Sequence, residues 1–296
     1  MDGDGIMKES QEDFNNIYIN GKKYRKNRQL GTGNFGIVYL VENENEKKYY
    51  AIKQILIEKE TEDDIKKIED EVKILSKICN DNNDNNHIIR YYDSCKDNKY
   101  FNILMEYCEG KSLREFINEY KNINKLIDEK IIYNFILDIC LGIKTIHKNK
   151  IIHRYLKPEN LFLTKDNKIK IGDFGISKQL KTNNQFANSV VGTSNYMAPE
   201  ILLQNNYNYK VDIWAFGCII YELFTLNLCF EGPLATLNNK IIEVIHGRIN
   251  THIYNSKWQD LIDSLLKRNY LERPSIDAIY MHIKKDIRIY FKNKIL

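Results

Sequence analysis

A cluster of glycines near the start of the chain has a spacing suited to phosphate chemistry. Residues 30–38 read Leu-Gly-Thr-Gly-Asn-Phe-Gly-Ile-Val, a G-x-G-x-x-G-x-V pattern. Glycines spaced in this way let the backbone approach phosphate groups closely, and dinucleotide-binding folds use them for that purpose. Those folds need a helix directly after the glycines, whereas residues 37–41 continue as a strand-like run, Ile-Val-Tyr-Leu-Val. The glycines are therefore expected at the tip of a β-hairpin, in either a phosphate-binding or a purely structural role.

A lysine and a glutamate that could serve the same chemistry follow this hairpin. Lys53 ends the strand-like run 51–53, at a position where an ordinary strand would also tolerate a lysine. Residues 60–78 change to helical spacing, because apolar side chains recur there every three or four residues. Glu71 lies on or beside this apolar stripe, where burying a carboxylate without a partner would be costly. Glu71 is therefore expected to have a partner.

These residues need two kinds of element to position them. Residues 24–57 alternate strand-like runs with polar turns, which predicts a β-meander, and two more such runs end at 103–105. Beyond the turn at residues 109–110 helical periodicity dominates. The helices are expected at 113–120, 129–147, 211–225, 258–267 and 276–283. This pattern predicts an α+β, bilobal fold with a small β-rich lobe and a larger α-helical lobe.

The expected boundaries follow from the same pattern. Residues 1–20 are polar and mostly acidic and are interpreted as a flexible N-terminal extension. The small lobe is placed at 24–108, the large lobe at 109–285 and a C-terminal tail at 286–296.

Composition limits the class of protein. The 296 residues are 43% hydrophobic and 28% charged, which is enough for two globular domains. The net charge of +4 comes from interspersed basic and acidic residues, so no nucleic-acid partner is expected. No uncharged stretch is long enough to span a membrane, and the six cysteines form no C-x-x-C pair that would suggest a zinc site. We therefore expect a monomeric cytoplasmic or nuclear protein without membrane contact.

Further motifs extend the glycine run and Lys53 into an ordered series. They are His153-Arg154-Tyr155-Leu156-Lys157-Pro158-Glu159-Asn160, Asp173-Phe174-Gly175, Ala198-Pro199-Glu200 and Asp212-Ile213-Trp214. In this order and spacing, from residue 30 to about residue 283, the chain resembles the eukaryotic protein kinases. In that family, Arg273 would pair with Glu200. The resemblance also implies the bilobal kinase fold.

The resemblance implies ATP and Mg²⁺ as cofactors. Lys53 would hold the α- and β-phosphates and pair with Glu71, which would explain an inward-pointing acid. Asn160 and Asp173 would offer Mg²⁺ a neutral and an anionic oxygen, the hard ligands that this ion prefers. The ATP-binding set implied by the family comprises Leu30, Gly31, Gly33, Gly36, Val38, Ala51, Lys53, Glu71, the gatekeeper Met105, the hinge residues Glu106 and Cys108, Phe162 beneath the adenine, and Asp173.

Within the family the chain is most similar to the NIMA-related serine/threonine kinases. The runs that carry this similarity are 173–177, 186–193 and 212–223. Lys157 and Thr193 fit specificity for serine and threonine, and the implied catalytic set is Tyr155, Lys157, Asn160, Asp173 and Thr193.

The resemblance also implies a phosphorylation site. Ser189 matches the activating phosphosite, where a phosphate would pair with Arg154 through charge-assisted hydrogen bonds; a plain loop serine is the alternative. Ser194 departs from the proline usual in this subfamily.

Tyr155 is the main departure from the family, because it replaces the catalytic aspartate. That aspartate accepts the proton of the substrate hydroxyl and orients its oxygen. A phenol with a pKa of about 10 is protonated near neutral pH and is not an equivalent base. Loss of a positioned base costs about 10²–10⁴-fold in rate. Glu159, the nearest acid in sequence, is not aimed at the substrate in the family.

Three histories fit this substitution: a kinase-derived regulatory protein that still binds ATP, an enzyme with an unusual rescue, and a kinase altered by one base of the Asp codon. Two functions follow. The first is a serine/threonine protein kinase domain, impaired at Tyr155, that acts on a protein substrate. The second is an ATP-binding pseudokinase, a scaffold or allosteric regulator of a protein partner. A small-molecule kinase is disfavoured, because residues 192–200 resemble the peptide-docking segment of protein kinases.

Overall fold

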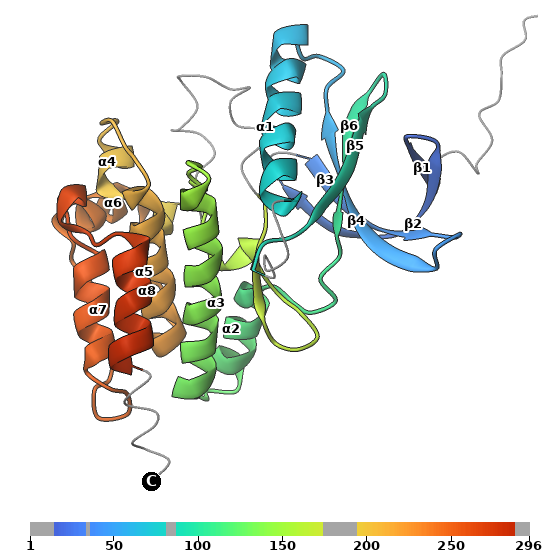
Figure 1. Cartoon of the computed structure of the whole chain (residues 1–296). Helices are drawn as coiled ribbons and strands as arrows, with labels where there is room; N and C mark the ends of the chain where they lie inside the picture. Colours follow the sequence, from blue (N-terminus) through green and yellow to red (C-terminus); the bar gives the residue numbers. More distant parts are fainter. Residues whose placement is uncertain (1–14, 34–35, 81–86, 174–193, 288–296) are drawn as a thin grey trace, which may run out of the picture. The chain divides into compact units, whose positions relative to one another are not determined.

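The structure is a computed structural model that describes residues 15–33, 36–80, 87–173 and 194–287. These residues fall into two compact units. The smaller unit contains residues 15–80 and 89–107, and the larger unit contains 87–88, 108–173 and 194–287. The α+β architecture predicted from the sequence is confirmed, with a curled β-sheet in one unit and mostly helices in the other (Figure 1).

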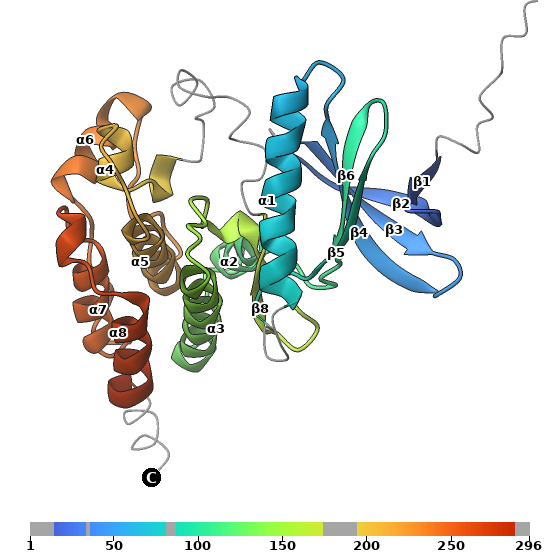
Figure 2. The same cartoon turned by 45° about the horizontal axis from the view of Figure 1, so that its top comes forward.

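The smaller unit is a six-stranded antiparallel sheet with one long helix. Its strands follow the order β1-β2-β3-β4-β6-β5, and helix α1 (Glu62–Asn80) packs against β5 (Figure 2). The strands are β1 (Asn16–Ile19), β2 (Lys22–Gly33), β3 (Gly36–Asn43), β4 (Lys48–Leu56), β5 (Tyr91–Lys96) and β6 (Tyr100–Glu106). The predicted meander and helix are thus present.

Strand β1 corrects the prediction of a flexible extension for residues 16–19, whereas residues 1–14 lie outside the described residues. Its residues alternate between exposed and buried, and Ile17 and Ile19 enter the core of the sheet. That core also contains Tyr24, Val41, Tyr50, Ile52 and Leu104. The Nδ2 of Asn20 donates to Asp93 at 2.8 Å, which ties the end of β1 to β5. Burial of two isoleucines therefore outweighs the polar composition of this segment.

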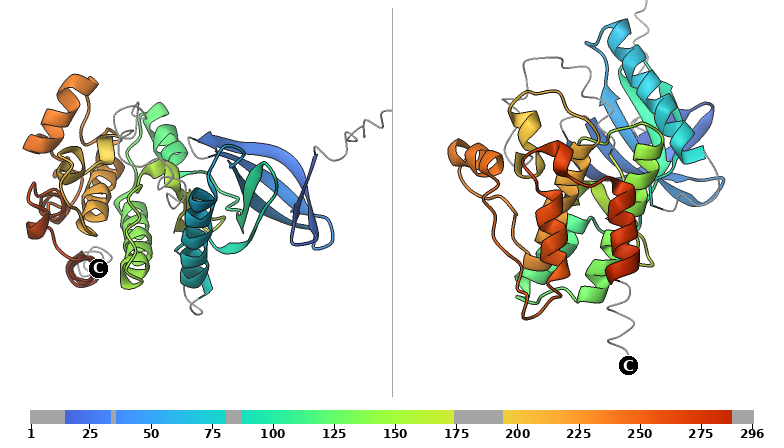
Figure 3. Two further views of the ribbon diagram at one scale, coloured as in Figure 1. Left: turned by 90° about the horizontal axis from the view of Figure 1, so that it is seen from above. Right: turned by 60° about the vertical axis from the view of Figure 1, so that its left-hand side comes forward.

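The larger unit is mostly helical. Its long helices α3 and α5 pack against each other, with α8 against α3 and α7 against α5 (Figures 1 and 3). The helices are α2 (Leu113–Asn122), α3 (Glu129–Lys148), α4 (Pro199–Leu202), α5 (Lys210–Thr225), α6 (Leu234–Glu243), α7 (Lys257–Leu265) and α8 (Ile276–His282). Every residue of α5 from Val211 to Phe224 is buried, as expected for a helix at the centre of a domain.

The structure adds several elements to the predicted helices. Helix α6, the short α4 and the hairpin of β7 (Leu161–Leu163) and β8 (Ile169–Ile171) were not expected from periodicity. Residues 87–88 also belong to the larger unit, although the small lobe was predicted to cover 24–108. The reason is that the carbonyl of His87 accepts from the N–H of Ile171, and Ile88 forms a β-bridge with the same residue. Within the described ranges, the helices are all too short or too polar to cross a bilayer.

Candidate functional site

The glycine run forms the predicted hairpin between β2 and β3. Gly33 and Gly36 pair at its end. Gly36 has a φ of +131°, and a Cβ built there would lie 2.0 Å from the carbonyl oxygen of Gln54 on β4. Any side chain would therefore clash with the neighbouring backbone, so the close packing of this hairpin on β4 requires glycine.

The strand register places four of the predicted ATP-binding residues on one face of the sheet. Val38 pairs with Lys53, and Ala51 with Met105, across neighbouring antiparallel strands. Side chains of paired residues point to the same face, and residues two apart along a strand share it. The core residues Tyr39, Ile52 and Leu104 form the intervening row and therefore occupy the opposite face. Lys53 is 5% exposed, so its ammonium group lies in a largely desolvated position.

The chain passes from the smaller unit to the larger one between the predicted hinge residues. Glu106 ends β6 and belongs to the smaller unit, whereas Cys108 begins a segment of the larger one. Glu106 is held by both its backbone and its side chain: its N–H donates to the carbonyl of Arg90 at 2.8 Å, and its Oε2 accepts from the N–H of Arg90 at 3.0 Å.

Several predicted residues fall wholly or partly outside the description. Glu71 lies in α1, but only its backbone is described, so its ion pair with Lys53 stays a prediction. Thr193 and Ser189 lie outside the described residues, as do Phe174 and Gly175. Among the remaining members of the ATP-binding set, Gly31 pairs with Val38 on β3, and Leu30 lies at a register shift of β2.

In the larger unit, His153 organises the loop that contains Tyr155. The N–H of Tyr155 donates to Nδ1 of His153 at 3.3 Å, and Nε2 of His153 lies 3.0 Å from the carbonyl of Gly172. Nδ1 therefore accepts and Nε2 carries the proton, which is the neutral form of the ring. Burial lowers the pKa of His153 and favours the same form. A neutral imidazole thus links the loop to the residue before Asp173.

Asp212 of α5 holds the same loop from the other side. Its carboxylate accepts from the N–H of His153 at 2.9 Å and from the N–H of Arg154 at 2.8 Å, and it contacts Nε2 of His147 at 2.8 Å. Arg154 has a φ of +69°, which a non-glycine residue rarely adopts. Asp212 was part of a recognised motif, but its bonds to this strained turn and to His147 were not anticipated.

The two predicted metal ligands are brought together by backbone contacts. The N–H of Gly172 donates to the carbonyl of Asn160 at 2.9 Å, so Asp173 directly follows a residue bonded to Asn160. The side-chain Nδ2 of Asn160 donates to the carbonyl of Tyr155 at 2.8 Å, which leaves its Oδ1 as an acceptor. One amide oxygen and one carboxylate are hard ligands that fit Mg²⁺.

The other predicted residues of this loop occupy defined positions. Tyr155 is half-buried, and its backbone is fixed at both ends by His153 and Asn160. The carbonyl of Lys157 accepts from the N–H of Asn160 at 3.0 Å. Phe162 lies in β7, paired with Lys170 of β8. Tyr155 thus stands in an ordered loop, where its phenol replaces the carboxylate expected of the family.

The ion pair expected between Glu200 and Arg273 is confirmed. Both side chains are buried, and the guanidinium contacts the two carboxylate oxygens at 2.7 and 2.8 Å. Its other N–H groups donate to backbone carbonyls of residues 210, 267 and 268.

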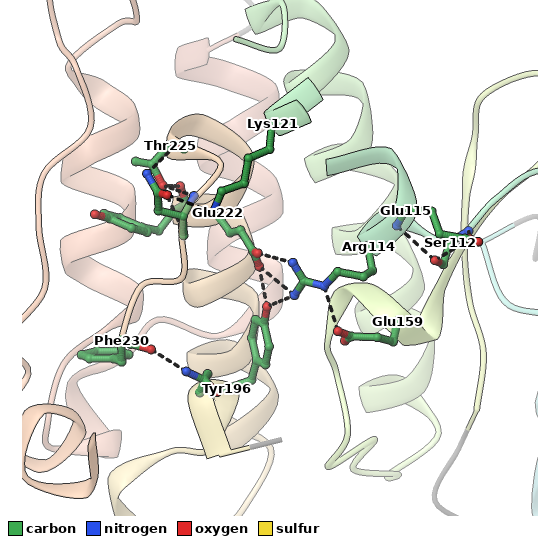
Figure 4. A network of polar contacts seen from close by, with 12 residues as sticks. Ser112, Arg114, Glu115, Lys121, Glu159, Tyr196, Glu222, Thr225 and Phe230 are labelled. Atoms are coloured by element: carbon green, nitrogen blue, oxygen red, sulfur yellow. Dashed lines mark hydrogen bonds and ion pairs between the residues drawn. The ribbon is translucent and has the colours of Figure 1, made fainter. Parts of the chain in front are cut away.

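A second arginine network was missed by the sequence analysis. Arg114 of α2 contacts Glu159, Tyr196 and Glu222, from three other segments of the larger unit (Figure 4). The only local signal was the pattern Ser112-x-x-Glu115, which forms a capping box at the start of α2 and indicates the helix but not the partners of Arg114.

Comparison with known proteins agrees with this geometry. The family model described as the protein kinase domain matches residues 24–283. The chain belongs to the protein kinase family. The matched range includes the glycine hairpin, Lys53, Asn160 and Asp173.

The kinase domain is also similar to NIMA-related kinases over most of its length, which confirms the resemblance carried by the motifs. It is 36% identical to the serine/threonine-protein kinase Nek1 of Mus musculus over 261 residues, 87% of this chain and 21% of that protein. It is 37% identical to Nek3 of Mus musculus over 255 residues, 85% and 47% of the two chains. It is 36% identical to Nek5 of Homo sapiens over 259 residues, which is 87% of this chain and 36% of that protein. The kinase domain thus spans less than half the length of these relatives.

Proposed function

We propose that the chain is a serine/threonine protein kinase domain that transfers the γ-phosphoryl group of MgATP to a protein hydroxyl, with its rate reduced by Tyr155. The observation that carries this proposal is the backbone hydrogen bond between Asn160 and Gly172, the residue before Asp173, which brings the segments of two hard oxygen ligands together. The match to the kinase family and the buried Lys53 support it.

The chemistry that MgATP supplies is an electrophilic γ-phosphoryl group whose charge the metal partly neutralises. Asn160 and Asp173 would hold the metal, and Lys53 would orient the α- and β-phosphates. Because such transfer depends mainly on positioning and electrostatic stabilisation, these residues account for most of the expected rate enhancement.

Tyr155 changes the handling of the substrate proton. At neutral pH a phenol with an ordinary pKa of about 10 is protonated, so it cannot accept a proton as a carboxylate does. Its backbone remains bonded to His153 and Asn160, which supports a local defect in proton acceptance and hydroxyl placement. The loop is therefore expected to regain function when a carboxylate is restored.

The test is phosphate transfer from γ-labelled ATP to a mixed protein substrate, by the chain and by Tyr155→Asp in parallel. Transfer by Tyr155→Asp to serine and threonine would support the proposal. Adding Lys53→Met should remove that transfer and weaken productive MgATP binding, because Lys53 orients the phosphates. Absence of transfer by a folded Tyr155→Asp that binds MgATP would reject it.

A second function is favoured specifically by Tyr155. With Lys53, Asn160 and Asp173 retained and the base replaced, the chain would bind MgATP without transferring phosphate, as a scaffold or allosteric regulator of a protein partner. An increase in melting temperature with MgATP, together with no transfer by the parent or by Tyr155→Asp, would favour this alternative. No increase with MgATP would reject both functions.

A further inference from the structure

Arg114 connects segments that lie far apart in the sequence. Its Nε donates to Oε1 of Glu159 at 2.8 Å, 45 positions along the chain. Its Nη1 donates to Oε1 of Glu222, 108 positions away, and Nη2 donates to the hydroxyl of Tyr196, 82 positions away (Figure 4). The hydroxyl of Tyr196 in turn donates to Oε2 of Glu222. One guanidinium thus contacts three side chains, and it forms a closed ring of hydrogen bonds with two of them, Tyr196 and Glu222.

The network combines opposite charges with burial, which fixes the protonation states of its members. The side chain of Glu222 is 2% exposed and that of Arg114 is 21% exposed, so the ion pair lies largely out of water. Burial disfavours the charged guanidinium, but the hydrogen bonds and charge of Glu222 outweigh it and raise the pKa of Arg114. Burial and Glu222 also raise the pKa of Tyr196 well above its ordinary value. Tyr196 therefore stays protonated and can both donate to Glu222 and accept from Arg114.

The partners of Arg114 belong to three segments with different expected roles. Glu159 directly precedes Asn160 in the short 3₁₀ segment 158–160 that follows Tyr155. Tyr196 lies in the 3₁₀ segment 194–196, shortly before Ala198 and Pro199. Glu222 belongs to the buried helix α5 and fixes the position of the guanidinium. Arg114 therefore links the loop that contains the candidate metal ligand to the start of the Ala-Pro-Glu segment.

We infer that Arg114 is a positioning residue that couples the 194–196 segment to the loop 155–160, with Glu222 as its buried counter-charge. This inference rests on the proposed kinase function, because it assigns the coupling to phosphoryl transfer. A guanidinium is suited to this task, since its planar fork of five donors can bind several partners at once. Lysine would keep the charge but concentrate it at one nitrogen, so it could not hold Glu159 and Tyr196 in the same geometry.

The activity test uses Tyr155→Asp as the parent and Arg114→Lys as the variant. We expect Arg114→Lys to lower kcat by roughly tenfold to a hundredfold, the cost of a misplaced reacting group, with little change in the KM for MgATP. Rates are divided by the folded fraction measured by tryptophan fluorescence. Lys121→Met is the matched control, because Lys121 lies on the same helix and contacts Asn227 instead of this network. Tyr196→Phe should lower kcat in the Arg114 protein and have little further effect beside Arg114→Lys.

Hydrogen exchange gives a second test that does not need activity, with all variants made in the chain that keeps Tyr155. The N–H groups of Asn160 and Leu161 donate within the loop, to the carbonyls of Lys157 and Pro158. Tyr196→Phe should speed their exchange by about three- to tenfold, the factor expected for the loss of one hydrogen bond, whereas Lys121→Met should not.

The two tests separate failure of the inference from failure of the proposed function. If Tyr155→Asp transfers no phosphate, the kinase proposal fails, and faster exchange in Tyr196→Phe would still support coupling through Arg114. If Tyr155→Asp is active but Arg114→Lys and Lys121→Met have equal kcat, or if Tyr196→Phe leaves exchange unchanged, the coupling role of Arg114 is overturned.

Discussion

Replacing Arg273 with methionine should be among the most destabilising single changes in the larger unit. The side chains of Arg273 and Glu200 are 0% and 4% exposed. All five N–H donors of the guanidinium are used: two bind the carboxylate, and three bind the carbonyls of Lys267, Arg268 and Lys210. Its guanidinium carbon also lies 4.9 Å from the ring centroid of Trp214. The substitution removes all of these contacts and leaves Glu200 as a buried charge.

The expected loss follows from that buried charge. Breaking a buried ion pair by removing one partner costs about 3–5 kcal/mol, because the other charge stays desolvated. This is a large part of the roughly 5–15 kcal/mol that stabilises a typical protein. For a unit of this size it corresponds to a decrease in melting temperature of about 6–20 °C. The double variant Arg273→Met with Glu200→Gln should recover part of the loss, since it removes the uncompensated charge.

The assay is urea denaturation followed by tryptophan fluorescence. Both tryptophans of the chain, Trp214 and Trp258, are buried in the larger unit, so the signal reports that unit. Lys144→Met is the matched control, because Lys144 pairs with Asp277 at 2.8 Å at a more exposed site and should cost less than about 1 kcal/mol. If Arg273→Met lowers the free energy of unfolding by no more than Lys144→Met does, the reasoning from burial is refuted.

Two further predictions concern the core of the sheet and the neutral histidine. Ile19→Ala should lower the free energy of opening of β2 and β3, measured by hydrogen exchange, by about 2–5 kcal/mol, because Ile19 is 1% exposed. Tyr18→Ala is the control, because Tyr18 is exposed. Equal losses in the two variants would contradict the burial of β1. Burial lowers the pKa of His153 below 6.5, so as the pH falls the unfolded chain gains a proton that the folded chain does not. The free energy of unfolding should then decrease by up to about 1.4 kcal/mol per pH unit below pH 6.5. Urea titrations at several pH values should show that this free energy falls less steeply with pH in His153→Asn. An equal pH dependence in the two proteins would contradict a lowered pKa of His153.

Local patterns were sufficient for the parts of the fold in which neighbouring residues determine the structure. The change from strand-like runs to helical spacing located α1 and the boundary near residue 108. The glycine run located the β2–β3 hairpin, because a strand follows it directly. The motif around residues 153–160 located the loop in which Asn160 is bonded to Tyr155.

The features that could not be predicted depend on contacts between distant residues. Strand β1 is a four-residue run inside the mostly polar stretch 1–20, and its assignment depends on two isoleucines that pack in one buried cluster with Tyr24 and Leu104. Arg114 looks like an ordinary helix-surface residue, and its role depends on partners 45 to 108 positions away. The contact of His147 with Asp212, 65 positions along the chain, is of the same kind. Periodicity and motif spacing carry no information on such pairs.

The proposed kinase activity depends on the residue at position 155, where Tyr155 is expected to reduce the rate. Its most direct test is the steady-state rate of phosphate transfer by Tyr155→Asp relative to Tyr155→Phe, with MgATP affinity measured for both by calorimetry. Tyr155→Phe keeps the ring but removes the hydroxyl, so any transfer that it retains does not depend on the phenol. We predict equal MgATP affinity and a rate about 10²–10⁴-fold higher for Tyr155→Asp, the usual contribution of a positioned base. Equal rates for the two variants, with MgATP bound equally well, would contradict the claim.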